Sequence, residues 1–451
     1  MHARPVARLA RWVDERVGAS RFTRSALNHP FPRHWSFLLG EIALYSFVVL
    51  VVTGTFLAFF YEPSTAETTY EGSYEPLHGE EMSRAYASAV ELSWDVRAGL
   101  VMRQIHHWAA LVFLAAIVAH LCRNFFTGAF RRPREINWFV GITMLILALV
   151  NGFAGYSLLD DLLSGTGLRI AYSIALAVPL IGTWLAFLAF GGEFPADDIM
   201  SRLFVIHIFI VPAMIAVLLG IHIALVWRQR HSQFRGHGRT ERNVVGTRFW
   251  PGYVAKSVGL FALVTAVLAA LGGLVQINPV WLYGPYDSAA VTTAAQPDWY
   301  MGWIEGAMRL AGPWAMEVGP FTLSELFVPA ILLPGVTFGV LYAWPFVERR
   351  VTGDRRSHQL LDRPRDRPGR TALGTGALTF YVVLFVAGSQ DIIAAKLELS
   401  QASVLWTLRV LVFVLPAAVA AFSYRLADDL RRGSSEPIDD AAEAPATTEA
   451  P

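Results

Sequence analysis

Eight apolar segments of about 20 residues alternate with polar loops along the chain, and each is long enough to cross a bilayer as a helix. A ninth apolar stretch, 168–190, contains Pro179 and Gly182, which favour two short interfacial helices over one span. The pattern therefore predicts an all-α polytopic membrane protein with eight transmembrane helices. The predicted spans lie near 38–60, 98–125, 137–157, 202–228, 253–276, 325–346, 372–393 and 403–425.

Arginine is distributed unevenly between the two sets of loops that eight spans create. The N-terminal arm and the loops at 126–136, 229–250 and 347–371 are crowded with arginine. On the opposite side, segment 61–84 is acidic and loop 277–324 is poor in arginine. Because short basic loops stay in the cytoplasm, both termini are predicted to be cytoplasmic. A ninth span would place the arginine-rich 229–250 loop outside, so the charge pattern favours eight.

Composition supports a membrane protein. Of the 451 residues, 54% are hydrophobic and 16% charged, against about 25% charged residues in an ordinary soluble domain. The single cysteine, Cys122, excludes a disulfide framework and a CxxCH attachment for c-type haem. The arginine-rich N-terminus lacks a short apolar core with a cleavage site, so it is predicted to be a cytoplasmic arm. The net charge of +1 does not suggest a nucleic-acid partner.

The chain is predicted to divide into four parts, with the main break in the basic loop near 232–250. The division comprises a cytoplasmic N-terminal arm (1–36), a histidine-bearing domain of four spans (37–232), a second domain of four spans (233–426) and a polar cytoplasmic tail (427–451). The tail is rich in Ala, Pro and Glu, a composition typical of disorder.

Two of the predicted spans each carry a pair of histidines on one helix face. His106 and His120 are 14 residues apart, and His207 and His222 are 15 apart. These steps correspond to about −40° and +60° around an α-helix. The step from His107 to His120 is about 220°, nearly the opposite face. His107 is therefore interpreted as a bystander at the rim of the site.

Both helices are predicted to run from outside to inside, so the histidines pair by depth. His106 and His207 form an outer pair, and His120 and His222 form an inner pair, about 21–23 Å away along the helix axis. Bis-imidazole ligation of two stacked haems fits best, which predicts a di-haem four-helix bundle. The alternatives are histidines hydrogen-bonded between helices and a proton relay in a haem-free transporter. A transporter would need charged residues near the midplane, and no convincing pair is present.

Glycines repeat with the same spacing in the two other helices of the predicted bundle. Gly40 and Gly54 are 14 residues apart in the first span, as are Gly141 and Gly155 in the third. A flat macrocycle wedged between helices needs neighbours without side chains, which glycine provides. Close helix packing explains membrane glycines in general. It does not explain a period that matches the histidines.

Three arginines lie three to five residues from a predicted ligand histidine, namely Arg103, Arg123 and Arg202. Haem carries two propionates, and the guanidinium fork pairs well with carboxylates. These arginines are therefore predicted to bind propionates. An alternative for Arg123 is that it only marks the membrane boundary.

Together these motifs resemble cytochrome b of the cytochrome bc family of quinol–cytochrome c reductases. The resemblance rests on "RQIH…H" in the second span, His207, Pro212 and His222 in the fourth, and the paired glycines. It also rests on "GYSLLDDLLSGTGLR" after the third span and "QPDWYMGW" at 296–303. It covers roughly residues 30–426. With "PDWY", the sequence is most similar to the actinobacterial menaquinol type.

The resemblance implies a subunit of a respiratory complex in a bacterial cell membrane. Quinol, here menaquinol, would be oxidised at an outer site. One electron would pass to a Rieske iron–sulfur protein, and the other through the outer and inner b haems to a quinone near the cytoplasm. Protons would be released outside and taken up inside. A cytochrome c subunit and a second copy of the chain are implied partners, with or without an attached terminal oxidase.

The resemblance also assigns residues to the outer quinol site. Asp298 would accept the proton of the quinol hydroxyl, with Tyr300 beside it. Pro297 and Trp299 belong to the same motif, and Tyr156 would line the same cavity. An alternative is that Pro297 and Asp298 only begin and cap a short helix.

Two positions depart from the family pattern. Leu159 stands where a proline is usual, which affects the shape of the outer pocket. At the inner quinone site Lys256 matches a family lysine, but Ser257 stands where many relatives have aspartate. The proton donor for inner quinone reduction is therefore open. His231, just past the fourth span, is equally well interpreted as a surface residue.

A second functional hypothesis is a di-haem membrane anchor that links a dehydrogenase to the quinone pool. It shares the haem ligands with the first hypothesis. It gives no reason for the "PDWY" loop at 297–300.

Overall fold

The computed structural model describes residues 3–290, 296–319 and 321–433. Within these residues, eight helices are long and apolar enough to cross a membrane, which confirms the prediction. The spans are formed by α3 (Leu38–Ala58), α5 (Gly99–Thr127), α6 (Glu135–Ser157), α9 with α10 (Ile199–Val205 and Val211–Gln229), α11 (Val254–Leu274), α13 (Leu333–Thr352), α14 (Pro368–Gly388) and α16 (Gln401–Arg432).

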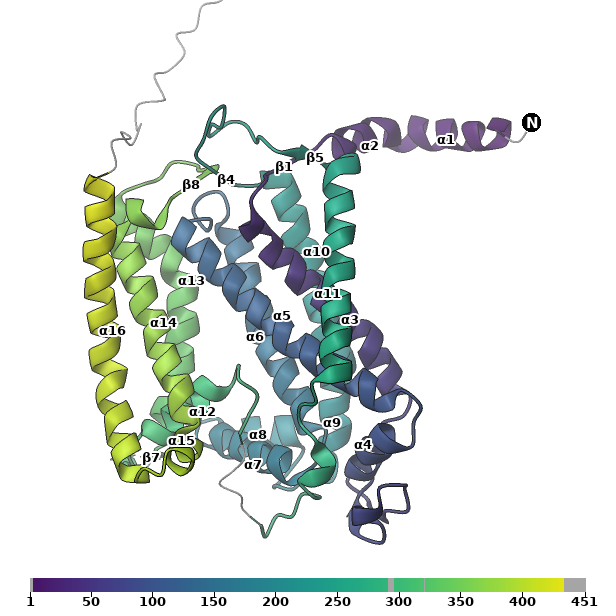
Figure 1. The fold of residues 1–451 in the computed structure, drawn as a ribbon, viewed down its shortest axis with the longest axis vertical. Coiled ribbons are helices and arrows are strands. Elements are labelled where there is room, and N and C mark those ends of the chain that lie inside the picture. The colour runs from purple at the N-terminus through teal and green to yellow at the C-terminus, as the bar shows by residue number, and fades with distance from the viewer. Residues whose placement is uncertain (1–2, 291–295, 320, 434–451) are drawn as a thin grey trace, which may run out of the picture.

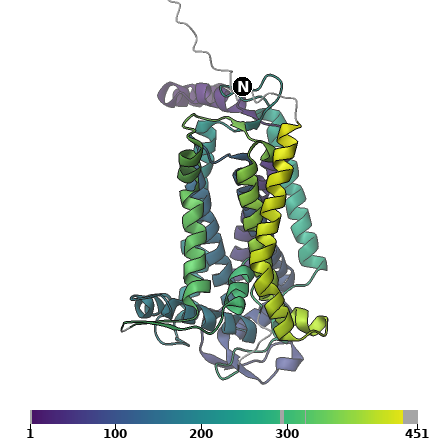
Figure 2. The same cartoon turned by 90° about the vertical axis from the view of Figure 1, so that its left-hand side faces the viewer.

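The spans form two adjoining groups (Figures 1 and 2). In the first group α3 packs along α5, α10 packs along α6, and α11 covers α3 and α5. In the second group α14 packs between α16 and the short helix α12 (Gly302–Leu310), while α13 contacts α6. The histidine-bearing helices α5 and α10 therefore both belong to the first group.

One end of the bundle, called the arginine-rich end from here on, collects the N-terminal helices and three basic loops (Figure 1). Helix α1 (Ala3–Val17) projects sideways beyond the bundle at this end, and α2 (Ala19–Leu27) connects it to the bundle. Short strands then join the loops: β1 (Pro30–Phe31) pairs with β5 (Thr247–Arg248), and β4 (Gln233–Phe234) pairs with β8 (Leu360–Leu361). The predicted grouping of these segments at one end is confirmed. Their cytoplasmic location stays a prediction.

A buried ion-pair network ties two of these loops to the second group of helices. The Arg370 guanidinium, on α14, lies 2.9 Å from the Asp362 carboxylate and also pairs with Glu348 on α13. Arg131, in the loop between α5 and α6, reaches the same Asp362 at 3.2 Å. Each buried charge has an opposite partner, which is the condition for burying charged groups at low cost.

The opposite end carries the remaining short elements: β2 (Glu67–Thr69), β3 (Glu81–Ser83), α4 (Arg84–Trp94), α7 (Leu162–Leu176), α8 (Gly182–Phe190), β6 (Met316–Val318), β7 (Phe321–Leu323) and α15 (Gln390–Lys396). Helices α7 and α8 take the place of a ninth span, as Pro179 and Gly182 predicted. The Asp161 side chain caps α7 by accepting hydrogen bonds from the backbone N–H groups of Leu163 and Ser164.

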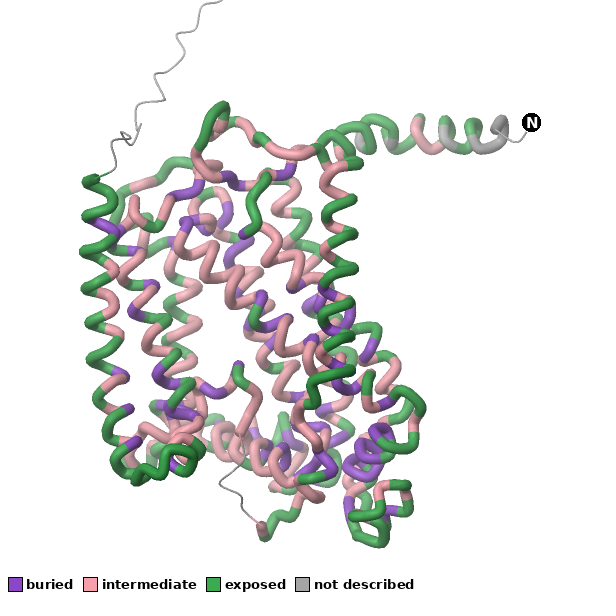
Figure 3. Tube along the Cα trace, in the orientation of Figure 1, coloured by how far each residue is buried: buried purple, intermediate pink, exposed green. Residues whose placement is uncertain are grey.

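Much of the length of α16 and α11 is exposed (Figure 3). Large apolar side chains contribute to the exposed surface of the spans: Phe413 on α16 and Val217 on α10 are 73% and 64% exposed. Such a surface is stable against lipid, because helices satisfy their own backbone hydrogen bonds there. Helix α16 continues to Arg432, past the predicted domain end at 426. Residues 434–451 of the predicted disordered tail lie outside the described residues, and the four-part division stays a prediction.

Candidate functional site

In the described part of the chain, two pairs of histidine rings face each other between α5 and the fourth span. The ring centroids of His106 and His207 are 6.1 Å apart, and those of His120 and His222 are 6.4 Å apart. These are the pairs that helical register and topology predict. A metal held about 2 Å from one nitrogen of each ring would separate the centroids by roughly 6 Å. Both pairs therefore have the spacing at which two imidazoles would hold one metal ion between them.

Hydrogen bonds orient the rings of the outer pair. The Nδ1 of His207 lies 2.9 Å from the carbonyl oxygen of Asn151 and donates to it. The Thr53 hydroxyl donates to the Val49 carbonyl, so it accepts from the Nδ1 of His106, 2.9 Å away. Both Nδ1 atoms are thereby assigned as protonated, which leaves each Nε2 with a lone pair for a metal.

A wider π-helical turn, Ile206–Ile210, contains His207 and separates α9 from α10. Pro212 follows this turn and has no N–H to continue the regular α-helical bonding. A π-turn absorbs one extra residue. The step of 15 between His207 and His222 therefore covers about the same rotation as the step of 14 on α5.

The paired glycines border the histidine rings. A Cβ atom would lie 3.2 Å from the His120 ring at Gly40 and 2.9 Å from the His106 ring at Gly54. At Gly155 it would lie 2.3 Å from the His207 ring. Gly141 differs, because a Cβ there meets nothing within 4 Å and the residue lines a cavity. Three glycines thus make room for the imidazoles themselves, and the fourth opens onto the cavity.

A cavity of about 540 Å³ extends from the inner pair to the arginine-rich end. His120, His222, Gly40, Gly141 and Arg123 line its deeper part. This volume lies within the range of about 300–1,000 Å³ that holds small-molecule ligands and cofactors. The cavity is mostly apolar, with a few polar groups at one end.

The three predicted propionate arginines differ in their surroundings. Arg123 lines the cavity and its guanidinium covers the Phe37 ring at 4.2 Å. Among the described atoms, its Nε and Nη2 have no hydrogen-bond partner, and neither has Nη2 of buried Arg103. Arg202 instead donates to the Leu188 carbonyl at 3.1 Å, and no contact with the histidine pairs is found for it in the described structure. The structure therefore keeps two candidates and does not support the third.

At the opposite end, Asp298 lies between two side chains from different parts of the chain. Its Oδ1 is 2.8 Å from the Nε2 of His107, and its Oδ2 accepts a hydrogen bond from the Tyr300 hydroxyl at 3.1 Å. Tyr300 is buried, and burial together with the neighbouring Asp298 raises its pKa, so it stays a protonated donor. Whether His107 is a bystander stays a prediction, but its ring, which faces away from the histidine pairs, contacts Asp298.

The rest of the "PDWY" motif forms a tight turn before α12. The backbone N–H of Met301 donates to the Asp298 carbonyl, and that of Gly302 donates to the Trp299 carbonyl. Helix α12 begins at Gly302, so Pro297 and Asp298 neither begin nor cap it. Tyr156, at the end of α6, lies within electrostatic range of Asp298.

The loop after α6 stabilises the wall of this region. Leu159, the departure from the family proline, packs against a buried cluster that contains Tyr86, Val280 and Trp281. The Ser83 hydroxyl donates to Asp160 at 2.5 Å, while burial raises the pKa of Asp160 to about 6. Leucine at 159 therefore has a packing role.

The residues predicted for the inner quinone site lie differently relative to this cavity. Lys256 is exposed and does not line the cavity, whereas the adjacent Ser257 does. His231 also lines the cavity, with its ring 4.5 Å from that of Phe31. Burial lowers the pKa of His231 to about 4, so the ring is neutral. The interpretation of His231 as a surface residue is therefore wrong.

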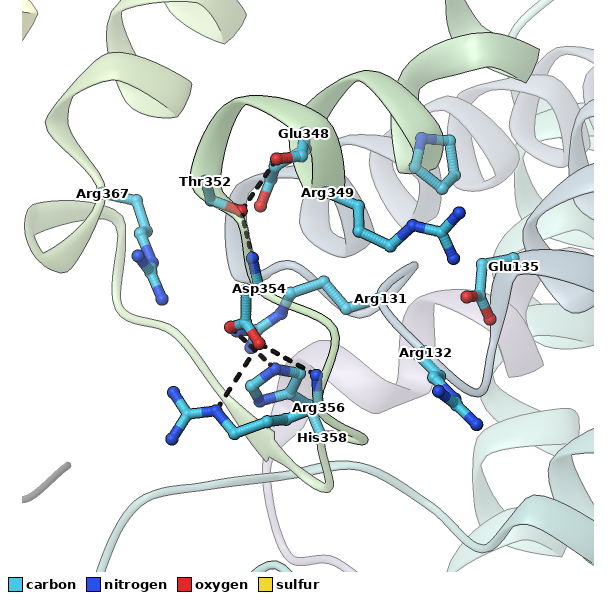
Figure 4. Close-up of a pocket in the computed structure, with 11 residues that line it drawn as sticks. Arg131, Arg132, Glu135, Glu348, Arg349, Thr352, Asp354, Arg356, His358 and Arg367 are labelled. Atoms are coloured by element: carbon cyan, nitrogen blue, oxygen red, sulfur yellow. Dashed lines mark hydrogen bonds and ion pairs between the residues drawn. The ribbon is translucent and has the colours of Figure 1, made fainter. Parts of the chain in front are cut away.

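A second, charged cleft lies between the loops of the arginine-rich end (Figure 4). Asp354 accepts a hydrogen bond from His358 at 3.0 Å and pairs with Arg356. The cleft has a volume of about 20 Å³, which is too small for an organic ligand. Among the described residues, no group of three or more His, Cys, Asp or Glu side chains is placed to hold a metal ion. The histidine pairs and the 540 Å³ cavity are therefore the better candidates for a cofactor site.

Comparison with known proteins agrees with this geometry. Residues 111–285 match the family described as cytochrome b (N-terminal)/b6/petB. The chain is 50% identical to the cytochrome bc1 complex cytochrome b subunit of Mycobacterium tuberculosis, over 97% of this chain and 80% of the relative. The corresponding subunits of Corynebacterium diphtheriae and Streptomyces coelicolor are 47% and 46% identical, each over 96% of this chain and over 80% and 79% of the relatives.

A solved structure titled "Hyperthermophilic respiratory Complex III" shares the fold. Its chain superimposes with a TM-score of 0.66 and covers 92% of this chain and 99% of its own. At 20% sequence identity, this likeness bears on the fold alone.

Proposed function

This chain belongs to the family of cytochrome b subunits of cytochrome bc1 complexes, and from that premise we propose how it works. It oxidises menaquinol at the opposite end of the bundle and passes one electron to a Rieske iron–sulfur protein. The other electron crosses the membrane to a quinone near the arginine-rich end. Protons are released where quinol is oxidised and taken up where quinone is reduced. The observation that carries the proposal is the two facing histidine pairs, with centroids 6.1 and 6.4 Å apart.

The residues present fit two b haems. His106 and His207 would hold the outer one, and His120 and His222 the inner one. When bound, the haems supply one-electron transfer between the two quinone sites. The unpartnered guanidinium nitrogens of Arg103 and Arg123 suit propionates, because each buried cation otherwise has donors without acceptors in the described structure.

At the quinol site, Asp298 accepts the proton of the quinol hydroxyl. The hydrogen bonds from His107 and Tyr300 hold both of its oxygens in place, so the carboxylate needs little reorganisation when substrate arrives. Pro297, Trp299 and Tyr156 are the proposed walls of the pocket. Gly152 lets the Tyr300 hydroxyl approach α6, because a Cβ there would lie 2.6 Å from it.

The alternative of a di-haem membrane anchor assigns no role to this arrangement. An anchor needs the histidine pairs but no carboxylate held by His107 and Tyr300 at the opposite end. The hydrogen bonds at Asp298 therefore favour the quinol-oxidising subunit.

The complex purified from bacterial membranes is expected to contain two b-type haems per copy of this chain, of distinct potential. The potentials should differ because the inner pair adjoins Arg123 while His107 and Asp298 adjoin the outer pair. A reduced-minus-oxidised spectrum with redox titration measures both, and mass spectrometry should find a Rieske protein and a cytochrome c in the preparation. A folded chain without haem would contradict the proposal.

Leucine at Gly141 is expected to exclude the inner haem while leaving the outer one in place. The new side chain meets no atom of the described structure within 4 Å of its Cβ and enters the cavity that His120 and His222 also line. The haem content should fall from two to one. Gly259→Leu is the matched control, because its Cβ also meets nothing within 4 Å but the residue does not line the cavity. Two haems in Gly141→Leu would argue against this placement.

A further inference from the structure

A carboxylate from α3 that lines the cavity is surrounded by three hydroxyl groups. The Tyr253 hydroxyl donates to the Oε1 of Glu41 at 2.6 Å, and the Ser257 hydroxyl donates to its Oε2 at 2.7 Å. Tyr45 also reaches Oε2 at 3.2 Å and bonds the Ser257 hydroxyl. The cluster joins α3 to α11 and the turn before it, segments more than 200 residues apart in sequence.

Glu41 is the one carboxylate among the described residues that line the cavity. The other charged lining residues are arginines: Arg123, Arg134 and Arg230. His231 lies on the same wall and is neutral, because burial lowers its pKa to about 4. Glu41 is therefore the carboxyl group that can exchange a proton with a molecule bound in this cavity.

We propose that Glu41 is the group that delivers a proton to the quinone at the inner site. The proposal deepens the proposed function and rests on it. It also answers the question that Ser257 raises: the carboxylate comes from α3, and Ser257 contributes a hydroxyl that holds it. Glu41 lines the same cavity as the inner pair, so a quinone bound there lies between an electron source and a proton source.

The reaction balances with one carboxylic acid and the solvent. One quinone takes up two electrons, which arrive one at a time through the proposed electron path, and two protons to give one quinol. Glu41 donates one proton to a quinone carbonyl oxygen and is left as a carboxylate. Water at the arginine-rich end returns that proton and supplies the second. The hydroxyls of Tyr253, Ser257 and Tyr45 stabilise the carboxylate that this step leaves, until water returns the proton.

A purely structural role would make Glu41 a tie between α3 and α11. Glutamine separates the two roles, because it keeps the size of the side chain and can still bond the three hydroxyls, but it carries no acidic proton. The structural role predicts that Glu41→Gln has little effect on electron transfer. The proposed role predicts a block confined to the inner site.

The test uses the whole complex and a short-chain naphthoquinone as the probe. In Glu41→Gln we expect both haems to be present and to be reduced by quinol at the wild-type rate, while the naphthoquinone reoxidises the inner haem at least about 10-fold more slowly. Binding of the naphthoquinone, followed as a rise in Tm, should change by less than about 3-fold, because the amide keeps the hydrogen bonds. Glu135→Gln is the matched control, since Glu135 begins α6 at the same end and does not line this cavity.

Reoxidation at the wild-type rate in Glu41→Gln would overturn the proposal. Recovery of the rate in Glu41→Gln/Ser257→Asp, which returns a carboxylate to the cluster, would support it strongly. If Glu41→Gln loses a haem, the Glu41→Asp variant replaces it in the test. Aspartate is an acid shorter by one methylene, so it is expected to slow reoxidation of the inner haem several-fold. An unchanged rate would overturn the proposal. If naphthoquinone fails to oxidise the wild-type complex, the proposed function itself fails, and with it this inference.

Discussion

Replacing His106 by leucine is expected to leave the chain with one haem and without quinol oxidation. The ring of His106 is one of the two that face each other in the outer pair, and leucine has no atom that binds iron. Removing a residue that only hydrogen-bonds to a metal ligand lowers metal affinity or activity by about 10–100-fold. Removing a ligand itself should therefore lower activity by at least about 100-fold. Pyridine haemochrome analysis and quinol–cytochrome c reductase assays measure the two effects.

The neighbouring residue supplies the control for that experiment. His107 is next to His106 in sequence but contacts Asp298, not the other histidines. His107→Leu is therefore expected to keep both haems and to lose activity through the misplaced carboxylate. Two haems in His106→Leu, or one haem in His107→Leu, would show that the pairing is wrong.

The second large effect is expected from Asp298→Asn. The amide keeps the shape of the side chain and can still bond Tyr300, but it cannot accept the quinol proton. General-base catalysis contributes about 10²–10⁴-fold, so the rate of quinol oxidation should fall by that factor. Both haems should remain, and electrons supplied backwards from the inner site should still reduce them, because the histidine pairs are untouched.

Asp287→Asn is the matched control for Asp298→Asn. Asp287 lies in the same loop and is exposed, and its side chain accepts a hydrogen bond from the backbone N–H of Ala289. Its variant should oxidise quinol at the wild-type rate. If Asp298→Asn does so too, Asp298 is not the proton acceptor, and the di-haem anchor becomes the better explanation of the histidine pairs.

Most of the membrane topology could be read from local pattern. Apolar length gives the eight spans because a helix must satisfy its own backbone in lipid. Pro179 breaks the stretch that became α7 and α8, and the arginine-rich loops gather at one end as their charge predicts. The main difference is at the end of α16, which runs to Arg432 because a polar helix can continue past the membrane.

The candidate site was only partly predictable. Register and topology pair His106 with His207 because helical geometry is periodic. The π-turn that contains His207 was not predicted, although Pro212 follows it directly. Arg202 and Lys256 stay predictions, because distance along a helix does not say which way a long side chain turns. In the described structure Arg202 donates to the Leu188 carbonyl, and Lys256 is not among the residues that line the cavity.

The sequence by itself determined the number of spans, the two histidine pairs and the family of this protein, because each follows from periodicity or from a contiguous motif. Tertiary structure alone decided the polar contacts between distant segments. His107 meets Asp298 across 191 positions, and Glu41 meets Ser257 across 216. No local pattern encodes such contacts, because they depend on how separate helices pack side by side. The proton-handling groups of both proposed quinone sites are of this kind.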